Sequence, residues 1–308
     1  MNIVFMGTPA FAVPMLEALA RRYTVSLVVS QPDALVGRKQ VLEPTPVKVA
    51  AQALGIPVFQ PERIGSDVEP IQACQPDLIV TVAYGQFLPN RVLDIPRLDA
   101  INVHASLLPK LRGGAPVQRA IERGHTKTGI SIIRMVKKMD AGPILCQKAL
   151  SIEDDDTSET LFKKLAPLGV EALIETVDQL QHGPVEGVPQ DDDEATFAPI
   201  IKKSEARIHW NQSARIIERK VRAFYPQPNL VFSAAGKRIK VLEATTTTKP
   251  EGTSPGTVCE ASQHRVVIAC LEDALVLQKV QLEGKKPMAI HAFMNGAGRT
   301  LLVPQMQL

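Results

Sequence analysis

Two polar side chains stand one residue apart where a buried strand is expected to end. The stretch 100–103 has the composition of a strand end and contains Asn102, and His104 follows it, before a loop that closes with Gly113 and Gly114. Because residues i and i+2 of a strand point to the same face, the amide and the imidazole are expected to project together. Open α/β enzymes bind ligands at such strand ends. An imidazole transfers protons near neutral pH, and an amide N–H donates to developing negative charge.

The carboxylate that can complete this group is Asp140, in a short loop between two expected strands. Each residue also has an ordinary structural interpretation. The sequence Asp140-Ala-Gly-Pro is typical of a β-turn. Asn102 can cap a turn, and His104 can be a hydrogen-bonded core histidine. Spacing alone does not bring the three together, so both interpretations stay open at this point.

The elements that must position these residues indicate an α/β fold. Near-continuous apolar runs at 2–6, 24–30 and 77–83 predict buried strands of a parallel sheet, with a helix over 10–22 between the first two. We therefore expect a Rossmann-like, mostly parallel sheet with helices on both faces. The turn after the first strand lacks the GxGxxG fingerprint, so it does not indicate a dinucleotide.

The last third of the chain changes character. The proline-rich and aspartate-rich stretch 189–207 predicts a linker, and a helix over 213–224 is rich in Arg and Lys. Short strands separated by Gly and Pro turns then predict a small β-barrel, with strands near 229–232, 238–243, 256–259, 266–270 and 275–282. The predicted organisation is a catalytic domain over 1–188, the linker, and a basic domain over 208–308.

Charge is distributed unevenly along the chain. The net charge of the whole is only +3, but residues 205–308 hold 14 Lys and Arg against 8 Asp and Glu, a net of +6, which leaves −3 for residues 1–204. A basic third on a mildly acidic body favours a polyanionic partner. Chance fluctuation produces such an asymmetry equally well.

Several classes of protein are disfavoured by composition. Cys74, Cys146, Cys259 and Cys270 have no CxxC spacing, which argues against a zinc site. Apolar neighbours around most of them are typical of free thiols in a reducing compartment. No apolar run approaches the roughly 18 residues that a membrane span requires, and the chain opens directly on an expected strand. We expect a cytoplasmic monomer that contacts no membrane.

Three motifs together resemble the signature of the folate-dependent formyltransferases: Asn102-Val-His104-Ala-Ser106-Leu-Leu-Pro109, Arg112-Gly-Gly-Ala-Pro-Val-Gln118 and Met139-Asp140-Ala-Gly-Pro-Ile144. The resemblance covers nearly the whole chain. It implies a Rossmann-like formyl-transfer domain followed by an oligonucleotide-binding-type (OB-like) barrel. It also implies that 10-formyltetrahydrofolate is the co-substrate, that no metal is needed, and that a trio of residues is catalytic: Asn102, His104 and Asp140.

The implied chemistry suits these residues. An amine attacks the formyl carbon, and Asn102 and a protonated His104 can donate to the oxygen on which negative charge develops. His104 can also move a proton between the amine and the folate nitrogen. Asp140 is expected to fix the orientation and tautomer of the imidazole. By resemblance, the folate contacts Ser106, Leu107, Leu108 and Pro109.

Further features resemble family members that formylate methionyl-tRNA. Segment 31–46 has no apolar period, and a connection of this length is usually functional or disordered. The resemblance implies that it approaches the acceptor stem through Arg38 and Lys39, while the basic third follows the backbone of initiator methionyl-tRNA. The matching features are Met6-Gly-Thr-Pro9, Gln31-Pro-Asp33, Gly37-Arg38, Pro44-Thr-Pro-Val-Lys48, Val82-Ala-Tyr-Gly85, Glu205-Ala-Arg-Ile208 with Trp210, and Ala223-Phe224.

Two other functions stay open. Family members that formylate a small amine, such as glycinamide ribonucleotide or an amino sugar nucleotide, share the trio. The long loop at Arg38 and the basic third favour tRNA over these. The second alternative is a non-catalytic nucleic-acid-binding protein on an inactivated scaffold, and the intact trio argues against it.

Overall fold

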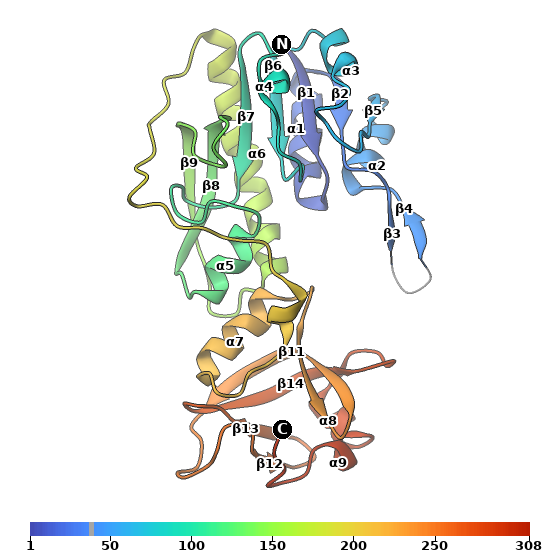
Figure 1. Ribbon diagram of the computed structural model, residues 1–308, viewed down its shortest axis with the longest axis vertical. Coiled ribbons are helices and arrows are strands. Elements are labelled where there is room, and N and C mark those ends of the chain that lie inside the picture. Colours follow the sequence, from blue (N-terminus) through green and yellow to red (C-terminus); the bar gives the residue numbers. More distant parts are fainter. Residues whose placement is uncertain (37–39) are drawn as a thin grey trace. The chain divides into compact units, whose positions relative to one another are not determined.

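The computed structural model describes residues 1–36 and 40–308 (Figure 1). Its contacts divide the chain into two compact units. Unit 1 comprises Met1–Pro116, Lys127–Ser151 and Phe162–Pro199. Unit 2 comprises Val117–Thr126, Ile152–Leu161 and Ile200–Leu308. Unit 2 thus contains two short stretches from the middle of the chain, and everything from Ile200 on.

Unit 1 is built on a seven-stranded sheet of order β5-β2-β1-β6-β7-β8-β9. The first five of these are paired in parallel, and β8 and β9 are added antiparallel at one edge. The expected Rossmann-like, mostly parallel sheet is confirmed. Its strands are β1 (Asn2–Gly7), β2 (Thr24–Val29), β5 (Val58–Phe59), β6 (Leu78–Val82), β7 (Asp99–His104), β8 (Lys127–Arg134) and β9 (Ile144–Ser151).

The side on which successive strands are added to the sheet changes at β1. The chain first adds β2 and β5 on one side of β1, and then adds β6 and β7 on the other side. Ligands of open α/β sheets bind at the carboxyl ends of strands beside such a reversal. This topology therefore draws attention to the ends of β6 and β7, where Thr81, Asn102 and His104 lie.

Helices connect the strands and cover both faces of the sheet (Figure 1). Proline is found in the first turn of α1, α2 and α3, where its missing N–H costs nothing. These helices of unit 1 are η1 (Ala10–Ala12), α1 (Val13–Arg22), α2 (Pro46–Ala53), α3 (Glu69–Ala73), α4 (Asn90–Leu93) and most of α6 (Ser158–His182). Helix α5 (Pro116–Glu122), from Val117 on, and the start of α6, through Leu161, belong to unit 2. The short α4 was not predicted from the sequence.

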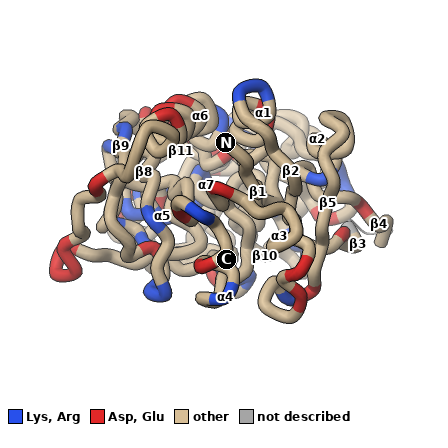
Figure 2. Tube along the Cα trace, turned by 90° about the horizontal axis from the view of Figure 1, so that it is seen from above, with Lys and Arg blue, Asp and Glu red and all other residues tan. Residues whose placement is uncertain are grey.

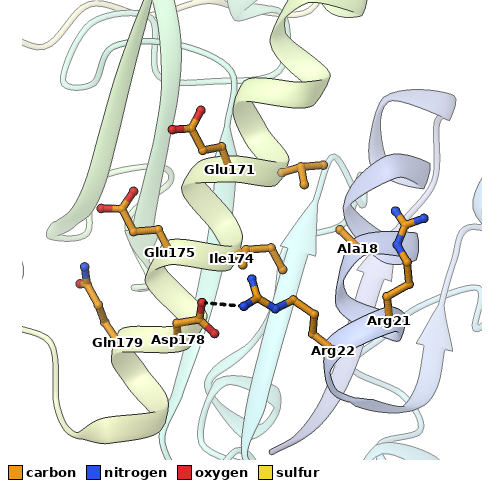
Figure 3. Close-up of a pocket in the computed structure, with 9 residues that line it drawn as sticks. Ala18, Arg21, Arg22, Glu171, Ile174, Glu175, Asp178 and Gln179 are labelled. Atoms are coloured by element: carbon orange, nitrogen blue, oxygen red, sulfur yellow. Dashed lines mark ion pairs between the residues drawn. The ribbon is translucent and has the colours of Figure 1, made fainter.

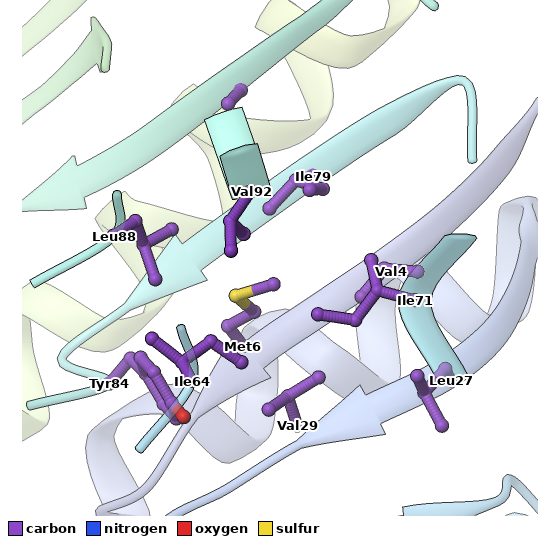
Figure 4. Packing of buried hydrophobic residues seen from close by; sticks show 11 residues of the cluster. Val4, Met6, Leu27, Val29, Ile64, Ile71, Ile79, Tyr84, Leu88 and Val92 are labelled. Carbon is purple, nitrogen blue, oxygen red and sulfur yellow. The ribbon is translucent and has the colours of Figure 1, made fainter. Parts of the chain in front are cut away.

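Strand β1 is buried on both faces, which explains its uninterrupted apolar sequence. On one face, Val4 and Met6 belong to a core cluster that includes Ile71 of α3 and Val92 of α4 (Figure 4). Tyr84, which follows β6, closes the same cluster, and its burial raises the pKa of the phenol to about 12.

On the other face, α1 and α6 pack closely together. A Cβ on Gly169 of α6 would lie 2.3 Å from Cε of Met15 in α1, so a larger residue here would make the methionine side chain move. The rings of Phe11 and Phe162 meet edge to face with centroids 5.3 Å apart. Basic residues end α1, whereas acidic residues line α6 (Figure 2), and Arg22 pairs with Asp178 at 3.5 Å.

Segment 31–46 contains two short strands that pair antiparallel as a hairpin, β3 (Ala34–Val36) and β4 (Val41–Glu43). Residues 37–39, between them, are not among the described residues. Strands of three residues are too short to show an apolar period, which is why the sequence did not indicate them. Leu35 and Leu42 are partners in the register, and both are exposed. Arg38 and Lys39 lie outside the described residues.

Unit 2 contains an antiparallel sheet of order β10-β11-β14-β13-β12, with β15 paired to β14. This half-barrel confirms the small β domain expected from the short strands. Its strands are β10 (Leu230–Ala234), β11 (Lys237–Thr247), β12 (Val258–Ala261), β13 (Val266–Ala269), β14 (Ala274–Leu282) and β15 (Met288–Ala289). Its helices are η2 (Lys203–Ala206), α7 (Ala214–Ala223), α8 (Ile290–Met294) and α9 (Gly298–Leu301). The sequence did not predict β15, α8 or α9.

The core of unit 2 lies between α7 and the sheet. Ile217 and Val221 of α7 are buried. Trp210, just before this helix, packs edge-on against Phe232 of β10, with ring centroids 5.6 Å apart. The side chain of Ser213 accepts a hydrogen bond from the N–H of Ile216, which begins the helix at a conventional N-cap.

Candidate active site

Strand β7 presents Asn102 and His104 on the same face, as the alternation of a strand requires. Thr81 of β6 is the register partner of Asn102. Its hydroxyl lies 2.9 Å from Oδ1 of Asn102. Because a hydroxyl donates to the amide oxygen, the Nδ2 group of Asn102 is left facing away from Thr81, toward Asp140.

Asp140 lies beside Asn102 in the loop between β8 and β9. Its Oδ1 accepts a 3.4 Å hydrogen bond from Nδ2 of Asn102, and its Oδ2 accepts one of 2.8 Å from the N–H of Gly113. Its Oδ2 is 3.6 Å from Nδ1 of His104. Asp140 has a φ of 50°, the left-handed conformation that costs a non-glycine residue energy. The carboxylate is thus held where three groups converge on it.

His104 is almost buried, with 6% of its side chain exposed. Its Nε2 is 2.9 Å from the carbonyl oxygen of Leu111. A carbonyl oxygen only accepts, so Nε2 carries a proton. Nδ1 faces the carboxylate of Asp140 at 3.6 Å. The imidazole is therefore oriented from two sides by protein oxygen atoms.

The backbone of segment 106–109, which is expected to contact folate, is hydrogen-bonded to the side chain of Ser131 in β8. The hydroxyl of Ser131 donates to the carbonyl of Ser106 at 2.7 Å and accepts from the N–H of Leu108 at 3.1 Å. Ser106 and Leu108 are buried, whereas Leu107 and Pro109 are half-buried. The hydroxyl of Ser106 donates to the carbonyl of Lys110, so its observed contact is within the protein.

Some residues of this site were missed from the sequence. Thr81 and Ser131 are polar side chains inside otherwise buried strands, and that is the signal that could have found them. Gln147 donates from Nε2 to Ser131 at 2.8 Å and to the carbonyl of Leu108 at 3.1 Å. Gln190 contacts the Asp140 loop. Neither glutamine has any local pattern that distinguishes it from a surface residue.

The basic residues of unit 2 are not all available to a partner. Arg222 pairs with Glu218, four residues earlier on α7, and donates to the carbonyl of Asp156 at 2.9 Å. Lys237 lies 3.8 Å from Glu283. Lys220 lies 3.9 Å from Glu122 and donates to the amide oxygen of Gln212 at 3.3 Å. Further basic residues of unit 2 are Arg215, Arg219, Arg238, Lys240, Lys285 and Lys286.

A groove of about 730 Å³ lies between α1 and α6 (Figure 3), and none of the trio lines it. Figure 3 shows Arg21 and Arg22 on one wall and the carboxylates of Glu171, Glu175 and Asp178 on the other. Within the part of the chain that the structure describes, no group of His, Cys, Asp or Glu is placed to hold a metal, and no helix is long and apolar enough to cross a membrane.

An amide and an imidazole at the end of β7 thus meet a carboxylate from the loop between β8 and β9, beside a mostly parallel sheet. Residues 1–177 match the model of the formyl transferase family, and residues 200–298 match the model of the formyl transferase C-terminal domain. The chain belongs to the formyl transferase family.

Curated relatives agree over almost the full length. The chain is 46% identical over 304 residues to methionyl-tRNA formyltransferase from Enterococcus faecalis, and this covers 97% of each chain. It is 44% identical over 302 residues to the enzyme of that name from Listeria innocua, again with 97% of each chain covered.

Solved structures share the fold at lower identity. One is HypX from Aquifex aeolicus in complex with tetrahydrofolic acid, with a TM-score of 0.66, 18% identity, and coverage of 97% of this chain and 47% of that one. Another is WlaRD, a sugar 3N-formyl transferase, with a TM-score of 0.68, 16% identity, and coverage of 93% and 99%. At such identities the likeness concerns the fold alone.

Proposed function

We propose that this formyl transferase moves the formyl group of 10-formyltetrahydrofolate to the α-amino group of methionine on initiator tRNA, for the initiation of translation. The observation that carries the choice of acceptor is the 46% identity to a methionyl-tRNA formyltransferase over 97% of both chains, unit 2 included. A role in initiation implies work in the cytoplasm.

The trio supplies what formyl transfer needs. A carbon–nitrogen bond forms between the formyl carbon and the methionine amine, and the bond to the folate nitrogen breaks. Nδ2 of Asn102 is aimed by the contact of Oδ1 with Thr81, so one of its N–H groups can donate to the formyl oxygen as negative charge develops there. Removing one such donor typically costs about 10²–10³-fold in rate.

In this proposal, Asp140 and His104 take part in the proton transfer. The amine must lose a proton and the folate nitrogen must gain one. Asp140 is 15% exposed and lies beside Asn102 and His104, so its carboxylate can accept the proton that the amine loses, and that proton can pass to the folate nitrogen as the carbon–nitrogen bond breaks. Proton transfer through a positioned pair of this kind contributes roughly 10²–10⁴-fold.

The folate is assigned to the segment Ser106, Leu107, Leu108 and Pro109. Ser131 and Gln147 hold the backbone of this segment, which favours a preformed surface. Leu107 and Pro109 are the half-buried members and offer apolar contact. HypX, which has the same fold, was crystallised with tetrahydrofolic acid, and its name supports the assignment only at the level of the fold.

The tRNA is assigned to the hairpin and to the basic residues of unit 2. Arg38 and Lys39 belong to the connection between β3 and β4, and unit 2 contributes the excess of positive charge. Such contacts bind phosphates without reading sequence, and they predict affinity that falls steeply with salt.

One competition experiment tests the proposal. The enzyme is incubated with 10-formyltetrahydrofolate and offered initiator methionyl-tRNA, elongator methionyl-tRNA, glycinamide ribonucleotide and an amino sugar nucleotide together. We expect the formyl group on initiator methionyl-tRNA. Transfer mainly to either small amine would overturn the choice of acceptor, and no transfer to any amine would overturn the assignment of the trio.

A further inference from the structure

The extended chain that follows α6 is hydrogen-bonded to both loops that carry the site. Val188 exchanges two backbone hydrogen bonds with Ile144, of 2.8 and 2.9 Å, beside the Asp140 loop. Ala198 donates to the carbonyl of Arg112 at 2.7 Å and accepts from Ala115 at 3.1 Å. Residues 188–198, here called the crossing segment, therefore connect the loop after β8 to the loop after β7.

Gln190 of the crossing segment uses both ends of its amide in this connection. Its Nε2 donates to the carbonyl oxygens of Asp140 at 2.8 Å and Gly142 at 2.7 Å. Its Oε1 accepts from Nε of Arg112 at 3.0 Å. A single half-buried side chain thus bridges the two loops.

Gln190 contacts a loop whose backbone includes a strained conformation. Asp140 is in the left-handed conformation, with a φ of 50°, which persists in a non-glycine residue only when its surroundings enforce it. A Cβ on Gly142 would lie 1.8 Å from the carbonyl oxygen of Arg134, so the loop is also tightly fitted on its other side. The two hydrogen bonds from Gln190 satisfy the carbonyl groups of Asp140 and Gly142 in this loop.

Arg112 gives the other end of the bridge a fixed anchor. Only 1% of its side chain is exposed, and its Nη1 donates to Asp192 at 2.7 Å. Hydrogen bonds from Lys138, and then from Arg112, hold the pKa of Asp192 below its usual value. A buried guanidinium needs such partners, and both of them, Gln190 and Asp192, come from the crossing segment.

The same segment also reaches the histidine. The hydroxyl of Thr196 accepts a 2.9 Å hydrogen bond from the N–H of Leu111. The carbonyl of Leu111 in turn faces Nε2 of His104 at 2.9 Å. Leu111 has a φ of 64°, again in the left-handed region. The crossing segment therefore supports the backbone on both sides of the His104–Asp140 pair.

We propose that Gln190 is a positioning residue that sets the location of the Asp140 carboxylate relative to Asn102 and His104; this rests on the proposed formyl transfer. The bridge keeps the two loops in register, so that the groups of the trio meet at the distances observed. Misplacement of a reacting group by about 1 Å costs on the order of 10²-fold in rate.

The test compares Gln190→Ala and Gln190→Glu with Gln179→Ala, a matched control on an exposed position of α6. Glu keeps an acceptor for Arg112 but lacks the N–H donors to the Asp140 loop. We expect kcat to fall about 10- to 100-fold in both Gln190 variants, with KM values for both substrates within about threefold of wild type by the same argument. The pH profile of kcat should shift because Asp140 is displaced.

Three outcomes are decisive. A Gln190→Glu variant with wild-type kcat would overturn the proposal, because the N–H donors would then be dispensable. The proposal would also be overturned by a variant with a lower melting temperature whose pH profile is unshifted and whose activity per folded molecule is unchanged. This comparison is made on whichever Gln190 variant folds. Failure of the wild-type enzyme to transfer formyl to any amine concerns the proposed function instead, and is measured first.

Discussion

The hydroxyl of Thr81 lies 2.9 Å from Oδ1 of Asn102, across the register between β6 and β7. The two side chains come from neighbouring parallel strands and share a face. The carboxylate of Asp140 can only accept, so it faces Nδ2 of Asn102, and the hydroxyl of Thr81 donates to Oδ1 at the other end of the amide. The orientation of the amide is a property of the fold, present before any substrate arrives.

Replacing Thr81 by Val tests this relationship. The change keeps the shape of the buried side chain but removes the donor, so Oδ1 of Asn102 loses a hydrogen bond worth about 1 kcal/mol. We expect kcat to fall about 3- to 10-fold from a loss of that size. Thr176→Val is the control, because Thr176 is similarly buried and its hydroxyl donates to the carbonyl of Ala172 in α6. Equal losses in both variants would show that the effect is general destabilisation.

Replacing Asp140 by Asn removes the negative charge at the centre of the trio and keeps the size of the side chain. We expect transfer to fall by at least about 10²-fold, while the melting temperature and tRNA binding stay near the wild-type values. Rapid single-turnover assays with formyl-folate separate chemistry from binding. Asp193→Asn, at an exposed position of the crossing segment, should have no effect. Retained activity in the Asp140 variant contradicts the assigned role.

Replacing Arg38 by Ala should weaken formylation of methionyl-tRNA without disturbing the folate site. The expected loss is in kcat/KM for tRNA, and the slope of log affinity against log salt should flatten by roughly 0.7–0.9 for each phosphate contact removed. Arg21→Ala, at the exposed end of α1, is the matched control. An unchanged kcat/KM and salt slope would remove the hairpin from the tRNA site.

Cys270 should resist alkylation in the native protein. Burial raises the pKa of its thiol to about 12, so only about one molecule in 10⁴ is thiolate at pH 8. Mass spectrometry after iodoacetamide treatment at pH 8 should find Cys270 unlabelled, and labelling should appear after unfolding in denaturant. Rapid native labelling of Cys270 would mean that the core of unit 2 opens readily.

Glu205 should contribute stability that depends on pH. The hydrogen bond from Arg119 lowers the pKa of this carboxyl in the folded protein. A group with a depressed folded pKa stabilises the protein above its unfolded value of about 4.3, and this stability is lost as the pH falls through the folded value. The melting temperature of Glu205→Gln should be lower than that of wild type at pH 7, and the difference should shrink below pH 4 or so. A constant difference across this range contradicts the linkage.

Much of the frame could be predicted from the sequence, because buried parallel strands have distinctive composition. The run at 77–83 and the strand end at 100–103 are recognisable without tertiary information, and alternation along β7 puts Asn102 and His104 on one face. The hairpin β3–β4 was not predicted because its strands are only three residues long and contain exposed apolar residues.

The meeting of the trio could not be obtained from spacing. Asp140 lies 38 positions after Asn102 and reaches it through a loop in a left-handed conformation at a residue that is not glycine. No local pattern of the sequence indicates such a backbone. The motif resemblance proposed the grouping, and the structure supplies the contacts. Gln190 lies still farther along the chain, in a stretch that the sequence indicated only as a linker.

The path of the chain has a consequence for how this protein can be divided. A fragment that stops at Pro199 retains residues 117–126 and 152–161 but lacks the rest of unit 2. Arg119 would then lose Glu205, and the carbonyl of Asp156 would lose Arg222. Conversely, a fragment that starts at Ile200 lacks those two stretches. Recombination with a foreign half at this junction would therefore separate residues of unit 2 that contact one another.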